Sequence, residues 1–191
     1  YGLPKEARPR KEKILAVSRQ LVNYLLLDKA AKVTVVECPD VNAIMTRVSD
    51  LWKKEAANKT RELTESLEVT DESLTEWLDK HSFVKNECRY LSPDAEKVLS
   101  KIPKVTIVGL IIDRKSIQVN RSLNRANELD IPACSLDLSS SNLSSMQEPL
   151  NVDCVLDALH GWRSKDWSTA LNEALRRHQE RHPKRPQHVE N

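Results

Sequence analysis

The stretch that decides the fold, residues 104–138, reads KVTIVGLIIDRKSIQVNRSLNRANELDIPACSLDL. Val105 to Ile112 is an almost unbroken run of β-branched and aliphatic residues, which is typical of a strand buried on both faces of a parallel sheet. The run ends directly in the charged triplet Asp113-Arg114-Lys115. Open α/β sheets hold their ligands at the carboxyl ends of central strands. We therefore expect the chemistry of this chain where that strand ends.

The segments on either side alternate between helical and strand patterns. After the central strand we predict a helix from Leu123 to Leu129 capped by Ser122, and a strand from Pro132 to Leu138. Before it, apolar periodicity predicts a helix over Lys11 to Leu27, a strand over Lys32 to Cys38, a helix capped by Asp40, a loop or frayed helix over Lys53 to Glu68, a helix over Glu72 to Leu78 introduced by Ser73, and a strand over Glu87 to Leu91.

The remaining helix signals lie in three places. Ser92-Pro93-Asp94 has the residues of a helix start, namely a serine cap, a proline at the first position and an acid in the first turn. Leu150 to Leu159 is predicted to be a helix ended by Gly161, and Asp166 is predicted to cap a last helix. Strands that alternate with helices predict an α/β fold with a mostly parallel sheet and helices on both faces.

Composition limits the class of protein. The 191 residues, 39% of them hydrophobic, suffice for one sizeable core, so we expect one domain over residues 1–182 followed by a basic tail, residues 183–191. No apolar run is long enough to span a membrane and the first residues form no apolar signal segment, so we expect neither insertion nor secretion. The start at Tyr1 rather than Met is compatible with removal of a targeting segment. The four cysteines stand singly in apolar segments, which favours buried free thiols and no metal site.

The formal net charge of +2 conceals basic ends around an acidic stretch, residues 62–79. Clustered lysines and arginines suit phosphate binding, because neutralising phosphates releases counterions, although such clusters also serve as solvated surface. With only Gly2, Gly109 and Gly161, the chain has no G-x-G-x-x-G turn and no P-loop. An ordinary dinucleotide-binding fold is therefore disfavoured.

Five motifs occur in the order and spacing of one family: Tyr90-Leu91-Ser92-Pro93-Asp94, Val108 to Arg114, Ser122-Leu123 with Ala126, Ala133 to Leu138, and Leu150 to Val155 followed by Asp166-Trp167 and Ala170-Leu171. In these residues the chain resembles the tRNA purine-9 N1-methyltransferases, a monomeric branch of the SPOUT superfamily. The resemblance covers residues 81–182 well, and residues 1–80 only in their helix and strand pattern.

The resemblance implies a SPOUT-type parallel sheet whose C-terminal part forms a trefoil knot that holds S-adenosylmethionine. The cofactor-binding residues it implies are Leu91, Ser92, Gly109, Leu110, Asp113, Leu136, Leu138, Leu150, Val152 and Cys154. Gly109 suits that role physically, because a residue without a side chain lets the backbone approach a ligand closely.

The resemblance also implies that Asp113 is the general base. N1 of guanine carries a proton that must leave as the methyl group arrives, whereas N1 of adenine has a free lone pair and needs no base. Asp153 stands where the family commonly has asparagine, so a second acid can assist proton transfer or position the purine; its alternative role is an acidic charge at a helix start. The cations implied to bind RNA are Arg114, Lys115, Arg121, Arg125, Arg176, Arg177, Lys184 and Arg185.

Two departures from the family, Val108 in place of a first glycine and Asp153, also occur in the branch of the mitochondrial RNase P methyltransferase subunit. Its S-L-x-x-A-x-x-L segment is similar to Ser122 to Leu129. This branch implies a mitochondrial matrix location, with nucleus or cytoplasm as the alternative, and other subunits of a tRNA-processing complex as partners.

Three functions remain open at the level of the sequence. The first is methylation of N1 of guanine, adenine or both at position 9 of tRNA. The second is a platform that presents precursor tRNA to a processing nuclease with weak or no methylation. The third is a nucleotide-binding α/β domain unrelated to RNA.

Overall fold

The computed structural model of the chain describes residues 11–28, 30–56, 60, 62–110, 119–139 and 150–181. The chain forms two compact units, Tyr1–Asp137 and Leu138–Asn191. This grouping does not test the single domain predicted over residues 1–182, which stays a prediction. None of the helices in the described ranges has the length and apolar character needed to cross a bilayer.

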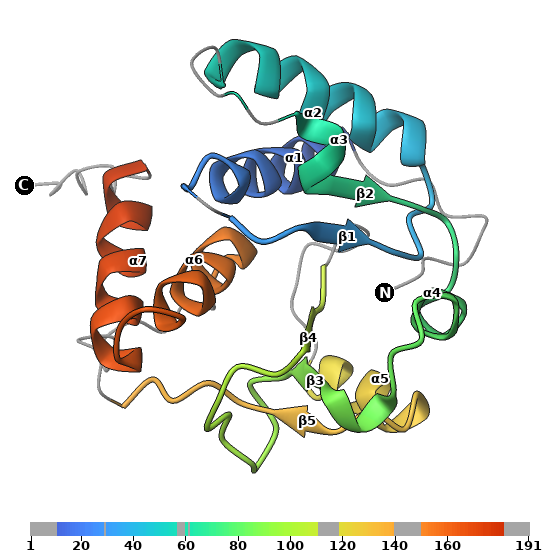
Figure 1. Ribbon diagram of the computed structural model, residues 1–191, viewed down its shortest axis with the longest axis vertical. Helices are drawn as coiled ribbons and strands as arrows, with labels where there is room; N and C mark the ends of the chain where they lie inside the picture. Colours follow the sequence, from blue (N-terminus) through green and yellow to red (C-terminus); the bar gives the residue numbers. More distant parts are fainter. Residues whose placement is uncertain are drawn as a thin grey trace, which may run out of the picture. The chain divides into compact units, whose positions relative to one another are not determined.

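Unit 1 contains two parallel sheets and the helices that connect their strands (Figure 1). Its elements, in chain order, are α1 (Lys11–Leu25), β1 (Val33–Val35), α2 (Val41–Glu55), α3 (Leu63–Ser66), β2 (Leu67–Val69), α4 (Leu74–Lys80), the 3-10 helix η1 (Lys85–Glu87), β3 (Cys88–Leu91), β4 (Val105–Val108), α5 (Arg121–Glu128) and β5 (Ala133–Cys134).

The first sheet pairs β1 with β2, and the second has the order β4-β3-β5. Every pair is parallel, with Val33 opposite Leu67 in the first sheet and Tyr90 opposite both Ile107 and Ala133 in the second. Parallel strands need crossover connections. α2 and α3 lie in the connection from β1 to β2 and α5 lies in that from β4 to β5, whereas residues 92–104 connect β3 to β4 without a helix. The predicted α/β class with a mostly parallel sheet is confirmed.

One apolar cluster holds the second sheet to its helices. Leu74 and Leu78 of α4, Cys88 and Tyr90 of β3 and Ala126 of α5 are buried together. This contiguous core fixes α4 and α5 against the sheet and so sets where the loops at the strand ends begin.

Two of the predicted helix caps in unit 1 are confirmed. The Asp40 carboxylate accepts a hydrogen bond from the Ala43 N–H at 2.9 Å at the start of α2. Ser73 forms a capping box with Glu76 at the start of α4: each side chain accepts a backbone N–H of the other residue. Both of these caps depend on hydrogen bonds between residues three positions apart.

Two sequence predictions for unit 1 are wrong, and two more are right only in part. No helix follows Ser92-Pro93-Asp94; the chain turns and makes an isolated bridge between Val98 and Ser135. The segment Lys53 to Glu68, predicted to be a loop or frayed helix, contains the end of α2, but also α3 and the start of β2, where Leu67 is buried and pairs with β1. The strand predicted from Pro132 to Leu138 is only Ala133–Cys134, and Ser122 does not cap α5, which begins at Arg121.

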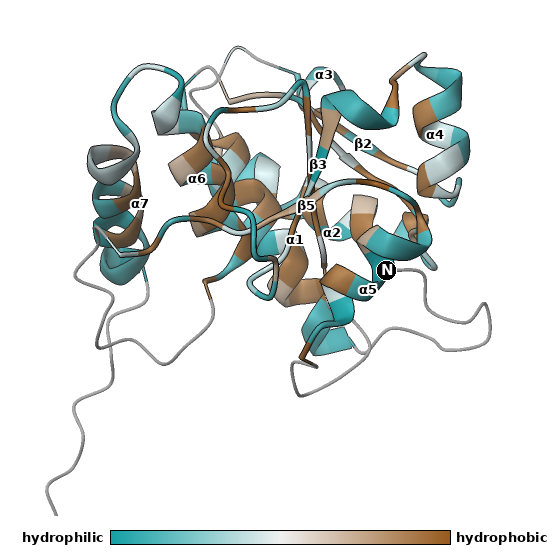
Figure 2. Cartoon of the chain, turned by 90° about the horizontal axis from the view of Figure 1, so that it is seen from below, coloured by the Kyte–Doolittle hydropathy of each residue, from teal (hydrophilic) through white to brown (hydrophobic). Residues whose placement is uncertain are grey.

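Unit 2 is described by two helices, α6 (Val152–Trp162) and α7 (Trp167–Arg181). α6 is largely apolar, as its brown colour in Figure 2 shows, and its Cys154 and Ala158 are buried together with Leu171, Ala174 and Leu175 of α7. Asp166 begins α7 as predicted: its carboxylate accepts from the Thr169 N–H at 2.9 Å, and this bond lowers the pKa of Asp166.

The prediction that Gly161 ends α6 is wrong, because the helix continues through Trp162. A Cβ atom at Gly161 would lie 3.1 Å from the Cβ of Ala170 in α7. The role of Gly161 is therefore to let the two helices approach closely, and it does not end the helix.

Candidate functional site

The carboxyl ends of β3, β4 and β5 lie level with one another at one edge of the sheet. Leu91 at the end of β3 pairs with Val108 of β4 and with Cys134 of β5. Because the strands are parallel, the residues that follow them leave the sheet at this same edge. The predicted cofactor-binding residues of unit 1 that the structure describes, Leu91, Ser92, Gly109, Leu110 and Leu136, thus lie at or just after the strand ends of this edge.

Ser92 ties this edge together. It is 2% exposed, and its backbone N–H donates to the Cys134 carbonyl at 2.9 Å. Its hydroxyl accepts from the Ser122 hydroxyl at 2.9 Å and from the Asp94 N–H at 3.2 Å. Ser122 therefore connects α5 to the end of β3, and that bond occupies the hydroxyl that was predicted to cap the helix.

A second link joins the same two segments. Asn120, directly before α5, has φ 60°, a left-handed conformation that asparagine tolerates better than most residues. Its N–H donates to the Asp94 carboxylate at 2.8 Å. The turn after β3 thus holds the first residues of α5 through both Ser92 and Asp94.

Sequence reasoning missed the roles of Asp94 and Asn120. The signal was present in Ser92-Pro93-Asp94, because a serine followed by an aspartate two residues later can form turn hydrogen bonds as well as begin a helix. The local pattern does not distinguish these outcomes, since the partner that decides it lies 26 residues further along the chain.

Several predicted site residues lie outside the described residues. They are Asp113, Arg114, Lys115, Lys184 and Arg185. Their roles as general base and cofactor contact, for Asp113, and as phosphate contacts, for the four cations, stay predictions.

In unit 2 the predicted acid Asp153 is buried, at 0% exposed, and contacts α7. The Arg181 Nη1 donates to Asp153 Oδ2 at 3.3 Å, and His178 Nδ1 lies 3.9 Å from Asp153 Oδ1. One turn further along α6, Asp157 is 1% exposed and accepts from Arg177 Nε at 2.9 Å and Arg177 Nη2 at 2.8 Å. The two acids and two arginines cross-link α6 and α7.

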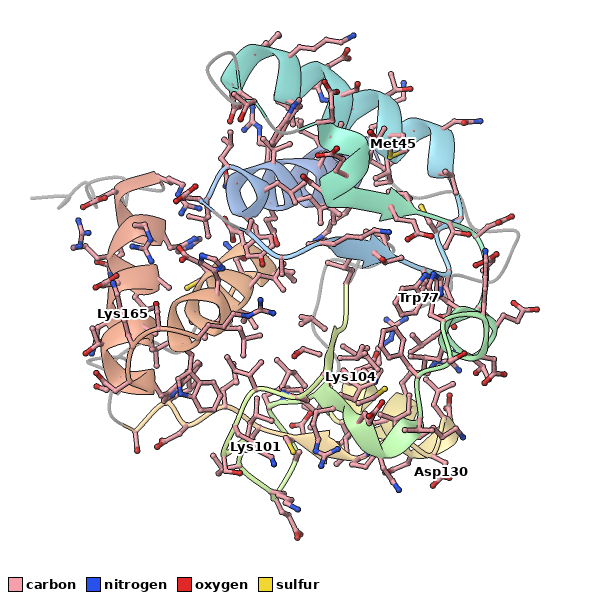
Figure 3. All side chains as sticks on the ribbon, viewed as in Figure 1. Met45, Trp77, Lys101, Lys104, Asp130 and Lys165 are labelled. Atoms are coloured by element: carbon pink, nitrogen blue, oxygen red, sulfur yellow. The ribbon has the colours of Figure 1, made fainter. Side chains whose placement is uncertain are left out.

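The charges of this network are compensated internally. The two hydrogen bonds that Arg177 donates to the Asp157 carboxylate raise the pKa of Arg177. At the edge of the helix pair, Lys165 (labelled in Figure 3) donates to both carboxylate oxygens of Glu173 at 2.6 Å and lowers the pKa of Glu173. Sequence reasoning missed Asp157 and Arg181, although the i,i+4 spacing of acids on one helix and arginines on the next was a usable signal.

The other predicted cofactor residues of unit 2 differ in exposure. Leu138 is 40% exposed, Val152 is half-buried and Leu150 packs against the core between α6 and α7. Cys154 is 1% exposed in that core, and burial, followed by the charges of Asp153 and Asp157, raises its pKa to about 12. Its thiol is therefore a packing group rather than a nucleophile.

All four cysteines are buried and unpaired, as predicted. Within the part of the chain that the structure describes, no three His, Cys, Asp or Glu side chains form a cluster suited to a metal ion.

Three of the predicted RNA-binding arginines are held by carboxylates. Arg125 donates to Glu37 at 2.6 Å, Arg176 donates to Glu180 at 2.6 Å, and Arg177 is bound by Asp157. Arg121, the fourth in the described chain, is half-buried in the first turn of α5. A paired arginine must give up or share its partner to bind a phosphate, so these residues are weaker candidates than isolated cations.

Comparison with solved structures shows that the fold is that of Trm10 crystal structures. Full-length spTrm10 in complex with SAH aligns with a TM-score of 0.65 at 21% identity, over 91% of this chain and 86% of that chain. spTrm10(74) aligns with 0.67 at 22% identity, over 86% of each chain. The dual-specific Trm10 from Thermococcus kodakaraensis aligns with 0.56 at 17% identity, over 86% of this chain and 91% of that chain.

The sequence model of tRNA (guanine(9)-N(1))-methyltransferase TRM10/TRM10A matches residues 25–179, and the chain belongs to this family. A search among curated proteins found no match. The family inferred from the five motifs is thereby confirmed, whereas the mitochondrial branch and the trefoil knot stay predictions.

Proposed function

We propose that the chain transfers the methyl group of S-adenosylmethionine to N1 of the purine at position 9 of tRNA, with guanine as the first substrate to test. The observation that carries the proposal is the family match over residues 25–179. It is supported by the solved spTrm10 complex with SAH, a molecule that differs from S-adenosylmethionine by the methyl group.

The residues of unit 1 suit such a cofactor. Leu91, Leu110 and Leu136 at one edge of a parallel sheet provide apolar surface for an adenine ring, and Ser92 is a buried polar group beside them. Buried apolar surface with a few fixed polar groups is the usual lining of a small-molecule site. When bound, the cofactor supplies an electrophilic methyl group on a positively charged sulfur.

The chain must accept one proton when guanine is the substrate. As the N1–methyl bond forms, the proton of N1 has to leave, and we assign its acceptance to Asp113. Asp153 is the weaker candidate, because it is fully buried and bound by Arg181. We propose that Asp153 holds α7 in place and that Asp113 alone acts as base.

The test is transfer of a labelled methyl group to unmodified tRNAs that differ only in carrying G, A or C at position 9. We expect label in the G9 tRNA and none in the C9 tRNA. Asp113→Asn should lower the G9 rate by about 100-fold or more, the usual contribution of a general base, and should affect an A9 tRNA less, because N1 of adenine carries no proton.

Retained S-adenosylmethionine and tRNA binding by Asp113→Asn is the control that separates lost chemistry from lost binding. Bound tRNA with no label in either purine would instead favour the platform that presents precursor tRNA. Equal labelling of the C9 tRNA would contradict position-9 specificity. The mitochondrial location and the association with other processing subunits stay predictions from the sequence.

A further inference from the structure

All the cations of α1 and α2 lack a carboxylate partner among the described residues, as do Lys97 and Lys101 between β3 and β4 and Arg163 after α6. In unit 1, Lys32, Lys80 and Lys104 each bind a glutamate at 2.7 to 2.9 Å. By contrast, no ion pair is made within the described residues by six cations of the first two helices, which are Lys11, Lys13, Arg19, Arg47, Lys53 and Lys54.

Two of these cations line one hollow. α1 and α2 lie side by side (Figure 1), and an open hollow between them is lined by Lys11 and Leu15 of α1 and by Thr46, Arg47 and Asp50 of α2. Lys11 is exposed, and Arg47 is half-buried without a carboxylate partner. Such an arginine keeps its full charge available to a ligand.

Helical spacing places two further cations, Arg19 and Lys54, on the sides of α1 and α2 that border this hollow. On α1, Arg19 follows Lys11 and Leu15 at intervals of four residues, and on α2, Lys54 follows Arg47 by seven residues, so each lies on the same side of its helix. We call Lys11, Arg19, Arg47 and Lys54 the cationic groove. Each row spans roughly 10 to 12 Å at 1.5 Å per residue.

We propose that the cationic groove binds the phosphate backbone of the tRNA substrate. The inference rests on the proposed function and adds to it a surface that the sequence did not predict. Cations that are not neutralised within the protein gain most from phosphates, because binding releases condensed counterions. Thr46, exposed beside Arg47, adds a hydroxyl that can donate to a phosphate oxygen.

Ile14, Leu15 and Ala43 contribute apolar surface to the open hollow, and cations of both helices border it. We take the occupant to be a polyanion rather than an acidic peptide, because a chain of phosphates can contact the cations of both helices. Asp50 reduces the local charge but leaves an excess of cations. The arginines predicted to bind RNA from the sequence, Arg125, Arg176 and Arg177, are already bound by carboxylates. Phosphate contacts in the described chain therefore fall best to α1 and α2.

The test compares two triple variants of the full chain that lower the net charge equally. The groove variant is Lys11→Gln/Arg47→Gln/Lys54→Gln. The matched control is Lys32→Gln/Lys80→Gln/Lys104→Gln, which removes three exposed but paired lysines of the same unit. Affinity for an unmodified G9 tRNA is measured from 50 to 200 mM salt, and circular dichroism and thermal unfolding verify folding.

We expect the groove variant to lose the salt dependence of about three phosphate contacts. Over this salt range the affinity of the unaltered protein should fall about 20- to 40-fold more than that of the groove variant, whereas the control should resemble the unaltered protein. The KM for tRNA should rise in the groove variant with kcat at saturating tRNA retained, because phosphate contacts bind ground state and transition state alike. A charge-keeping variant, Lys11→Arg/Arg47→Lys/Lys54→Arg, should restore binding.

Equal behaviour of the groove variant and the control would overturn the groove and leave the proposed function intact. A groove variant that binds tRNA normally but methylates slowly would also overturn it. Absence of both tRNA binding and methyl transfer in the unaltered protein would overturn the groove together with the proposed function. Loss of binding that the charge-keeping variant does not restore would exclude phosphate neutralisation as its cause.

Discussion

Replacing Arg177 by glutamine should destabilise the α6–α7 pair strongly. Asp157 is 1% exposed, and Arg177 supplies two of its hydrogen bonds, at 2.9 and 2.8 Å. Removing one partner of a buried ion pair costs about 3–5 kcal/mol, because the remaining charge is left in a medium of low polarity. The Arg177 side chain is 29% exposed and Arg181 Nη2 remains 3.5 Å from Asp157, so we expect a cost near the lower limit, about 3 kcal/mol.

The assays are urea denaturation, which gives the free energy of unfolding, and hydrogen exchange of the α6 amides, which reports on the stability of unit 2 directly. Arg176→Gln is the matched control: it breaks an exposed pair with Glu180 and should cost under about 1 kcal/mol. The double variant Asp157→Asn/Arg177→Gln should be more stable than Arg177→Gln alone, because it leaves no charged carboxylate at position 157 without its arginine. A cost for Arg177→Gln no greater than that of the control would refute the buried network.

Three further predictions follow from single contacts. Gly161→Ala should lower the free energy of unfolding by about 1–3 kcal/mol, because the new methyl group would lie 3.1 Å from the Cβ of Ala170. Adding Ala170→Gly to this variant should restore the stability. Unchanged stability of the single Gly161→Ala variant would contradict the close approach of the two helices. Ser122→Ala should cost about 1 kcal/mol through the lost hydrogen bond to Ser92, measured by thermal unfolding, and a neutral effect would show that this link is not stabilising. Burial raises the pKa of Cys154 to about 12, from about 9 in the unfolded chain. The contribution of the neutral thiol to the free energy of unfolding is therefore complete below pH 9 and falls between pH 9 and pH 12 by up to about 1.4 kcal/mol per pH unit. A Cys154→Ala variant whose stability falls with the same slope in this alkaline range would disprove this.

Local chemistry accounts for the features that the sequence predicted best. The caps at Asp40, Ser73 and Asp166 depend on donors two or three residues away, so the necessary information lies within one helical turn. The apolar run at Val105–Val108 predicted the parallel strand β4 correctly, but the prediction that it is a central strand buried on both faces is wrong. All four residues of β4 are half-buried, and among the described strands β4 lies at the edge of the order β4-β3-β5, so composition did not distinguish a half-exposed strand from a buried one.

The failures share the opposite property. β2 was missed because Leu67 to Val69 follows a charged stretch, and only pairing with β1, more than thirty residues earlier, makes it a strand. Ser92-Pro93-Asp94 carries a helix-start pattern, yet its serine and aspartate are occupied by Ser122 and Asn120 across the sheet edge.

The candidate site divides in the same way. The cofactor-binding residues that the family motifs imply in unit 1 stay predictions; the structure adds that strand register brings Leu91 level with Val108 and Cys134. Whether each arginine is paired with a carboxylate was not predictable, because the sequence does not show which residues lie beside it in the folded chain. Only the folded chain shows that Arg177 is bound to Asp157, whereas Arg47 has no carboxylate partner among the described residues.

By itself, the sequence determined the α/β class, the family and the helix caps at Asp40, Ser73 and Asp166, since these depend on periodicity, motif order and contacts within a turn. The tertiary structure alone decided which polar groups are buried, which cations are neutralised and which carry charge to the surface. The physical reason is that the free energy of a charge depends on its solvation and its nearest partner, and both are set by residues far apart along the chain.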